Sequence, residues 1–178
     1  MKCLFKIIAL LLLCFPVFAV PIAYNGSNNP GDGSWNRPIG SGPNISGLGP
    51  VNYSVQAFTT NTTGTYDFNS LQSYDGYLHL YETSFDPANQ VNNLLAGDDD
   101  GSLGIGSSEI LGLMLTAGLN YFLVTSAFAN GNVGTFTNTI TDQAGTAIIT
   151  LQSVPEPTTL ALFVLGLAGL GFGRRKKA

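Results

Sequence analysis

Short runs in which apolar and polar residues alternate dominate the middle of the chain. The clearest run covers residues 76–82, where Leu78 and Leu80 occupy alternate positions among bulky polar side chains. This two-residue period is that of a β-strand with one face turned inward. An apolar period of 3.6 residues, which would indicate a helix, does not persist over three turns between residues 20 and 157. The pattern therefore predicts an all-β domain.

Eight runs of this kind are separated by turns rich in Gly, Asn, Asp and Pro. They cover residues 51–58, 65–71, 76–82, 91–96, 109–116, 119–128, 133–140 and 146–152. Strands of this length and spacing are typical of an antiparallel β-sandwich. We therefore expect one sandwich domain of about eight strands over residues 51–152. In residues 119–128 apolar residues fall on both faces, which indicates a central strand.

Residues 20–50 precede these strands and are rich in Gly, Pro and Asn. This composition predicts a long loop or a strap across the sandwich rather than a domain. The side chains expected to anchor this lead segment are Trp35, Arg37, Ile39, Ile45 and Leu48. Arg37 is the only cation between residues 20 and 157, so we expect it to pair with a nearby carboxylate. Contact with an anion or a sugar acid is the alternative.

Residues 1–19 have the three parts of a secretory signal peptide: a start with two lysines, an apolar run, and small residues at the end. The small residues predict cleavage between Ala19 and Val20. Cys14 raises the alternative of a lipoprotein signal, but its neighbours fit that motif poorly. The sequence therefore predicts export across the inner membrane.

The end of the chain has three parts. Residues 153–157 contain Val154, Pro155, Glu156 and Pro157, and the two prolines favour an extended conformation. Residues 158–173 carry no charge and would span roughly 24 Å as a helix, close to the ~30 Å hydrocarbon core of a membrane. Residues 174–178 contain Arg174, Arg175, Lys176 and Lys177, which favour the cytoplasmic side. We therefore expect a transmembrane helix over residues 158–173 with a basic cytoplasmic end.

This order of segments resembles the PEP-CTERM sorting signal of exported bacterial proteins, over residues 154–178 only. The resemblance implies that a membrane-embedded exosortase recognises the tail and cuts near the Pro-Glu-Pro. The protein would then be anchored transiently and afterwards reach the cell surface or the extracellular matrix. Because such proteins typically come from bacteria that make exopolysaccharide, it also implies association with exopolysaccharide or biofilm. An ordinary C-terminal membrane anchor is the alternative.

The net charge of residues 20–157 differs from that of the whole chain. The whole chain has a formal net charge of −4, with 7 cations and 11 carboxylates. All 11 carboxylates but only one cation lie between residues 20 and 157, so this part carries 1 − 11 = −10. Such a domain has nothing to neutralise phosphates, which excludes nucleic acid as a partner.

The residue types that catalysis needs are scarce. Both cysteines, Cys3 and Cys14, precede residue 20, and His79 is the only histidine. A Ser-His-Asp triad would need His79, and no Gly-x-Ser-x-Gly segment accompanies it. The acids fall in turns of a small sandwich without long insertions, which does not favour a glycosidase. We therefore expect a non-catalytic protein.

Residues 51–140 show a weaker resemblance, to the bacterial pre-peptidase C-terminal domain. Three segments carry it: residues 74–81, residues 97–101 and residues 115–124, followed by a Gly-Asn-Val-Gly-Thr-Phe stretch. The resemblance implies a jelly-roll-like sandwich that serves as an accessory domain. Some members of that family bind calcium.

An acidic loop is the first candidate binding site, and its ligand would be calcium, the only cofactor that the sequence indicates. Its residues are Asp98, Asp99 and Asp100, with Asp75 or Glu109 brought near by strand pairing. Carboxylate oxygens are the ligands that calcium prefers. A solvated acidic turn without a metal is the alternative.

An aromatic stripe is the second candidate. If Tyr77 and Tyr81 face solvent, their rings would stack on sugars; if they face a second layer, they are core residues. Two classes of function therefore stay open. One is a surface or matrix protein, and the other is a calcium- or carbohydrate-binding accessory module.

Overall fold

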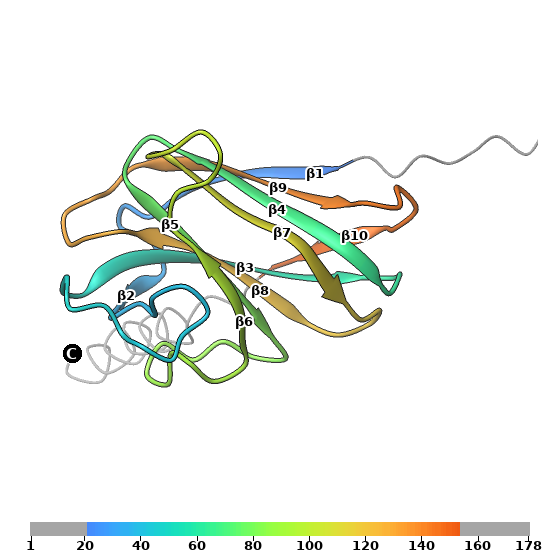
Figure 1. The fold of residues 1–178 in the computed structure, drawn as a ribbon, viewed down its shortest axis with the longest axis horizontal. Helices are drawn as coiled ribbons and strands as arrows, with labels where there is room; N and C mark the ends of the chain where they lie inside the picture. The colour runs from blue at the N-terminus through green and yellow to red at the C-terminus, as the bar shows by residue number, and fades with distance from the viewer. Residues whose placement is uncertain (1–20, 154–178) are drawn as a thin grey trace, which may run out of the picture.

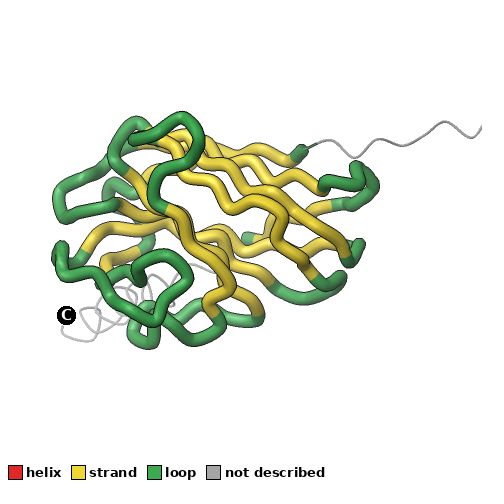
Figure 2. Tube along the Cα trace, in the orientation of Figure 1, coloured by secondary structure: helices red, strands yellow, loops and turns green. Residues whose placement is uncertain are grey.

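A computed structural model describes residues 21–153, which form an all-β structure of ten strands in two sheets without a helix (Figures 1 and 2). The strands are β1 (Ile22–Ser27), β2 (Gly33–Trp35), β3 (Val51–Thr60), β4 (Gly64–Gln72), β5 (Gly76–Glu82), β6 (Leu94–Asp98), β7 (Ser107–Leu115), β8 (Tyr121–Ala127), β9 (Thr135–Asp142) and β10 (Ile149–Gln152). All eight predicted strands are present, with bounds shifted by a few residues. The prediction of an all-β sandwich is confirmed.

The two sheets are antiparallel throughout. The first has the order β1-β9-β4-β7, and the second has the order β10-β3-β8-β5-β6 with β2 also paired to β3. From β3 onward the chain changes sheet at every connection except the one between β5 and β6. This alternation resembles the connectivity of a jelly roll, to which β2 and β10 are additions. β8 lies between β3 and β5, so the central position expected for residues 119–128 is confirmed.

The main core lies between the sheets and follows from the alternation in each strand. In β5, Leu78 and Leu80 point inward and are fully buried. They meet large side chains from both sheets, namely Phe58, Tyr66, Phe68, Leu115, Tyr121, Leu123 and Ile140. Each fully buried aliphatic or aromatic side chain of this kind contributes roughly 1.5–3 kcal/mol. This core fixes the strand register that the loops at either end depend on.

The lead segment contributes strands to both sheets, where the sequence predicted only a loop or strap. β1 pairs along its whole length with β9, from Ile22 opposite Ile140 to Ser27 opposite Thr135. β2 pairs three residues with the start of β3. Both strands are short and rich in Gly, Asn and Ser, so their backbone pairing leaves little trace in the side-chain pattern. The strand count rises from about eight to ten for this reason.

The lead segment also covers the outer face of the second sheet. Trp35, Val51, Tyr53, Tyr81 and Val124 form a second buried cluster there. Of the five expected anchors, Trp35 and Arg37 are buried, whereas the other three side chains are 41–51% exposed. Those three lie on or near a small loop closed by a β-bridge between residues 38 and 45. β5 is therefore buried on both faces, which explains why its polar stripe is not at the surface.

Several predicted features lie outside the described residues. These are the signal peptide with its cleavage site at Ala19 and Val20, the Pro-Glu-Pro motif, the apolar segment 158–173 and the basic end. Within residues 21–153, no helix is long and apolar enough to cross a membrane.

Candidate functional site

Three of the predicted acidic residues meet at one end of the second sheet. Carboxylate oxygens of Asp75, Asp99 and Asp100 lie within 4.8 Å of one another. Antiparallel pairing of β5 and β6 brings them together, because Leu78 lies opposite Asp98 and His79 opposite Gly97. The residue before β5 and the residues after β6 must therefore be neighbours. We call these three residues the acidic cluster.

The other two predicted metal ligands have different roles. The Oδ2 atom of Asp98 accepts a hydrogen bond of 2.7 Å from the backbone N–H of Glu109. The Oε1 atom of Glu109 accepts one of 2.7 Å from the hydroxyl of Ser102. Asp98 is the last residue of β6, and side chains of successive strand residues point to opposite faces. Asp98 therefore faces β7, away from the acidic cluster.

The electrostatics of the acidic cluster are unfavourable without a counterion. Burial raises the pKa of Asp99 to about 6, and the nearby carboxylates of Asp100, Asp75 and Asp98 add to the shift, while Arg37 opposes it. Burial also raises the pKa of Asp75, with Asp100 contributing. The Oδ1 atom of Asp99 is buried and has no hydrogen-bond partner among the described residues. A divalent cation would relieve both the repulsion and the missing contact.

Arg37 lies beside this cluster and is almost fully buried. Its Nε donates to the carbonyl of Phe128 at 3.0 Å, and its Nη1 donates to the carbonyl of Pro38 at 3.2 Å. Its Cζ atom lies 3.9 Å from the ring centre of Tyr77 and 4.8 Å from that of Phe128. Burial lowers the pKa of Arg37, while Tyr77, Asp99 and Asp75 oppose the shift. Among the described residues, carbonyls and rings thus hold the guanidinium, and the predicted salt bridge to a nearby carboxylate is not formed.

His79 is fully buried beneath the lead segment. Its Nε2 atom lies 3.1 Å from the carbonyl oxygen of Pro38, and its ring stacks on Tyr77 with 4.6 Å between the ring centres. Trp35 meets the imidazole edge-on at 5.2 Å. Burial lowers the pKa of His79 to about 3, despite the hydrogen bond to Pro38. The imidazole is therefore neutral at pH 7 and shielded from solvent.

The two tyrosines proposed for sugar stacking belong to the interior. Tyr77 is 3% and Tyr81 is 0% exposed. The Tyr77 hydroxyl accepts a hydrogen bond of 2.6 Å from the backbone N–H of Gly40, and the Tyr81 hydroxyl donates one of 2.6 Å to the carbonyl of Gln90. Because the lead segment covers this face, neither ring is free to stack on a sugar. Tyr77 and Tyr81 are therefore core residues, which was the alternative that the sequence left open.

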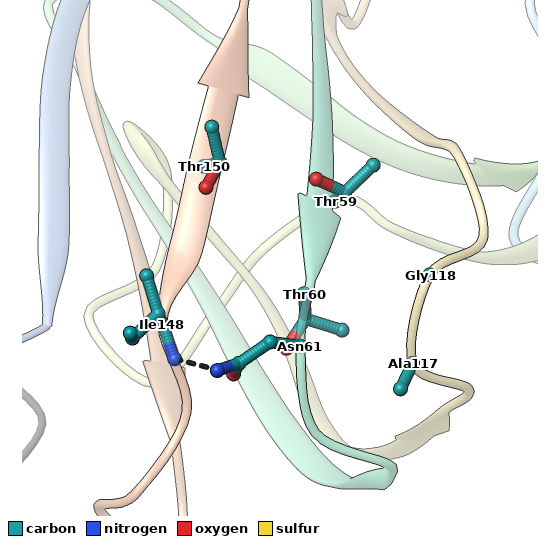
Figure 3. A pocket seen from close by; sticks show the side chains of 7 residues that line it. All are labelled: Thr59, Thr60, Asn61, Ala117, Gly118, Ile148 and Thr150. Atoms are coloured by element: carbon teal, nitrogen blue, oxygen red, sulfur yellow. Dashed lines mark hydrogen bonds between the residues drawn. The ribbon is translucent and has the colours of Figure 1, made fainter.

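Another pocket, of about 580 Å³, lies elsewhere (Figure 3). It is lined by Thr59, Thr60, Asn61, Ala117, Gly118, Ile148 and Thr150. Within it, the Oδ1 atom of Asn61 accepts a hydrogen bond of 2.7 Å from the backbone N–H of Ile148. These residues lie at the far end of β3 from the acidic cluster, because Tyr53 pairs with Ser126 and Phe58 with Tyr121. No ionisable side chain lines this pocket.

A smaller pocket, of about 330 Å³, adjoins the acidic cluster. Arg37, Tyr77, Asp99 and Phe128 contribute to its wall. Sequence reasoning missed this pocket, because it depends on how the lead segment folds over β5 and β8. The one available signal was Arg37 itself, the only cation in a domain of carboxylates.

The described residues define an acidic, all-β sandwich with a carboxylate cluster at one end and no exposed histidine. The similarity of the chain to a known family lies in the segment that follows β10. Residues 153–177 match the PEP-CTERM protein-sorting motif, so the chain carries this motif. The motif implies export and surface sorting, with an exosortase as the processing partner. No curated protein matches the sequence, and the resemblance of residues 51–140 to the pre-peptidase C-terminal domain is not confirmed.

Proposed function

We propose that this protein is a non-catalytic component of the bacterial cell surface or extracellular matrix, and that it associates with exopolysaccharide after sorting. The observation that carries the proposal is the sorting motif at residues 153–177, which starts directly after β10 ends at Gln152. A folded, acidic β domain is thus joined to the signal without a separate domain between them. An acidic surface keeps such a domain soluble and spaced from other polyanions.

The buried state of His79 supports a non-catalytic role. General acid–base catalysis needs a group with a pKa near the working pH that reaches the substrate. The only histidine has a pKa of about 3 and no exposure. Burial raises the pKa of Asp99 to about 6, and this carboxyl group lies beside those of Asp75 and Asp100.

Intact-mass measurement of the protein from its own cells tests sorting. In the parent strain we expect a species that ends near Pro157, with or without an added group, in the surface or matrix fraction. In a strain that lacks the exosortase we expect the tail to be retained in the membrane fraction. A chain that keeps Ala178 in both strains would leave an ordinary membrane anchor as the explanation.

A second candidate function is calcium binding at the acidic cluster, and the convergence of Asp75 with Asp99 and Asp100 favours it. The donor set fits calcium, because carboxylate oxygens can bind in either mono- or bidentate form and backbone carbonyls and waters complete the shell. The buried, unpartnered Oδ1 of Asp99 is one oxygen that gains a contact. Arg37 weakens the site, since its charge acts on Asp99 and Asp75.

Calorimetric titration of the full chain with calcium tests this second function. We expect Asp100→Asn to weaken binding by about tenfold or more, because it removes one charged ligand. Asp98→Asn makes the same change of charge at a residue that faces β7 instead, and is the matched control. Equal loss in both variants would indicate a general effect of charge and not a site.

A further inference from the structure

The pocket beside the acidic cluster is formed by the lead segment. Its lining residues are Arg37, Ile39, Ser46, Gly47, Leu48, Tyr77, Asp99 and Phe128. The β-bridge between Pro38 and Ile45 holds the loop of the lead segment in place above the end of β8. A volume of about 330 Å³ is near the lower limit for small-molecule sites, which run from ~300 to 1,000 Å³. The pocket is therefore large enough for one small ligand.

The polar wall offers both donors and acceptors. Arg37 is 2% exposed, and the two hydrogen bonds from Nε and Nη1 use only part of the five N–H donors of a guanidinium. Asp99, by contrast, supplies hydrogen-bond acceptors, and its Oδ1 atom is buried without a partner among the described residues. Ser46 is 8% exposed, and its hydroxyl oxygen accepts from the backbone N–H of Leu48 at 3.3 Å, which leaves its own proton to donate.

The remaining wall is apolar. Ile39 is 51% and Leu48 is 46% exposed, although both were expected to anchor the lead segment. Together with the half-buried ring of Phe128, they line one pocket and are not scattered over the surface. An apolar wall with a few convergent polar groups is the usual composition of a ligand site.

Charge decides which class of ligand fits. Asp75, Asp99 and Asp100 carry three carboxylates within 4.8 Å of one another, against the single cation of Arg37. An anionic ligand would meet net repulsion there, and a purely apolar one would cover the polar groups of Arg37, Ser46 and Asp99 without giving them hydrogen bonds. The ligand that fits is neutral, donates and accepts hydrogen bonds through neighbouring groups, and has an apolar face.

A sugar ring has these properties. We propose that this pocket binds one neutral monosaccharide unit, with Asp99 accepting a hydrogen bond from a hydroxyl, Arg37 donating one to an adjacent oxygen, and the C–H face of the ring packed against Phe128 and Leu48. This inference rests on the proposed association with exopolysaccharide, because it names the unit that the domain would recognise. Tyr77 contributes to the pocket wall, but the proposed stacking partner of the sugar is Phe128 and not the buried Tyr77 or Tyr81 ring.

Saturation-transfer NMR on the full chain tests the proposal, since it detects weak sugar binding directly. The chain is kept in a zwitterionic detergent without a sugar head group. The probes are glucose, galactose and mannose, with glucuronate as the anionic counterpart of glucose. We expect at least one neutral sugar to receive saturation, and glucuronate to receive several-fold less.

Two pairs of variants locate the site. Gly47 lines the pocket, and a Cβ atom there meets nothing within 4 Å. Gly47→Trp is therefore expected to block the pocket and abolish the signal, whereas Gly47→Ala is expected to keep it. Asp99→Asn is expected to weaken sugar binding by about tenfold, because a hydrogen bond to a charged group is lost. Asp98→Asn removes a neighbouring charge that faces β7, outside the pocket wall, and is expected to retain binding.

Two results would overturn the proposal: an unchanged signal in Gly47→Trp, or no signal from any neutral sugar with folded protein. Circular dichroism of each variant confirms folding. Stronger binding of glucuronate than of glucose would also overturn it. None of these results bears on export and cleavage, which the mass measurement decides, so the pocket and the proposed function can fail separately.

Discussion

The guanidinium of Arg37 lies over the ring of Tyr77, with 3.9 Å between Cζ and the ring centre. This contact joins the lead segment to β5 and positions the one cation of the domain beside the acidic cluster. A cation over an aromatic face in a desolvated place is worth up to about 2 kcal/mol. The ring therefore holds the arginine as well as filling space.

Two substitutions at Tyr77 separate the ring from its hydroxyl. Tyr77→Phe keeps the ring under Arg37 but loses the hydrogen bond from Gly40, and we expect it to cost about 1 kcal/mol of unfolding free energy. Tyr77→Leu also loses the contacts with Arg37 and His79, and we expect about 3 kcal/mol. Urea denaturation measures both. Equal losses in the two variants would show that the ring contact contributes nothing.

The buried His79 should make the fold sensitive to acid. Its pKa is about 3 in the folded chain, below the ordinary 6.5, so the unfolded chain binds a proton more readily between these values. Stability from this residue is complete above pH 6.5 and falls as the pH drops toward 3. The loss reaches roughly 4 kcal/mol at the lower limit.

His79→Phe tests this prediction. At pH 7 we expect the variant to be less stable than the parent, because the carbonyl of Pro38 loses its partner. Between pH 6.5 and 4 we expect its urea midpoint to fall less than that of the parent, because phenylalanine cannot take a proton. Parallel pH profiles for the two proteins would contradict the argument.

Asp99 should have the opposite pH dependence. Its pKa is raised from 3.8 to about 6, so the folded chain holds the proton more tightly than the unfolded chain. The stability due to this proton is present below pH 3.8 and is lost as the pH rises through 6. The charged groups that act on Asp99 are Asp100, Asp75 and Asp98, with Arg37 opposing them.

Asp99→Asn should therefore stabilise the fold at pH 7 in the absence of calcium. We expect a gain of no more than about 1 kcal/mol, because the carboxylate is partly solvated and screening weakens its repulsion. At pH 4 the gain should vanish. Thermal denaturation at both pH values measures the difference, and a variant that is less stable at pH 7 would refute the prediction. With calcium present, binding by the parent should weaken as the pH falls below 6.

Asp142 holds the turn that leads from β9 to β10. Its carboxylate accepts hydrogen bonds from the backbone N–H groups of Thr146 and Ala147 at 2.7 and 2.8 Å, and from that of Ala144 at 3.2 Å. Burial alone would raise the pKa of Asp142, but these donors outweigh it and lower the pKa. The turn places β10 against β3, immediately before the sorting motif.

Removing this carboxylate should loosen β10. We expect Asp142→Ala to cost about 2–3 kcal/mol and Asp142→Asn, which keeps an acceptor but loses the charge, about 1 kcal/mol. Hydrogen exchange of the β10 amides should accelerate in the same order. Unchanged exchange in Asp142→Ala would show that β10 is held by its pairing with β3 alone.

The sequence was most informative where side chains alternate. Leu78 and Leu80 predicted the inner face of β5, and the eight predicted strands all exist because each carries such a pattern. β1 and β2 could not be predicted in the same way, since their Gly, Asn and Ser residues give no run of alternating apolar side chains and the strands are defined by backbone pairing. Local pattern contains no information about which distant strand supplies the partner.

The candidate site was predicted in part for a similar reason. Pairing of two strands near Asp75 and Asp99 was enough to expect these residues together. Asp98 and Glu109 were expected there too, but the alternation of side chains at the end of β6 turns Asp98 to the opposite face. Tyr77 is buried because the lead segment covers it. The path of that segment across the sheet cannot be predicted from the hydrophobic periodicity of the sequence.

The burial of Arg37 has a consequence for the survival of the domain outside the cell. Peptidases of the trypsin type require an arginine or lysine side chain to enter their specificity pocket. Between Lys6 and Arg174 the sequence has only Arg37, which is 2% exposed and is followed by a proline, a residue with a fixed φ and no backbone N–H. Residues 21–153 therefore offer these peptidases no accessible bond to cut.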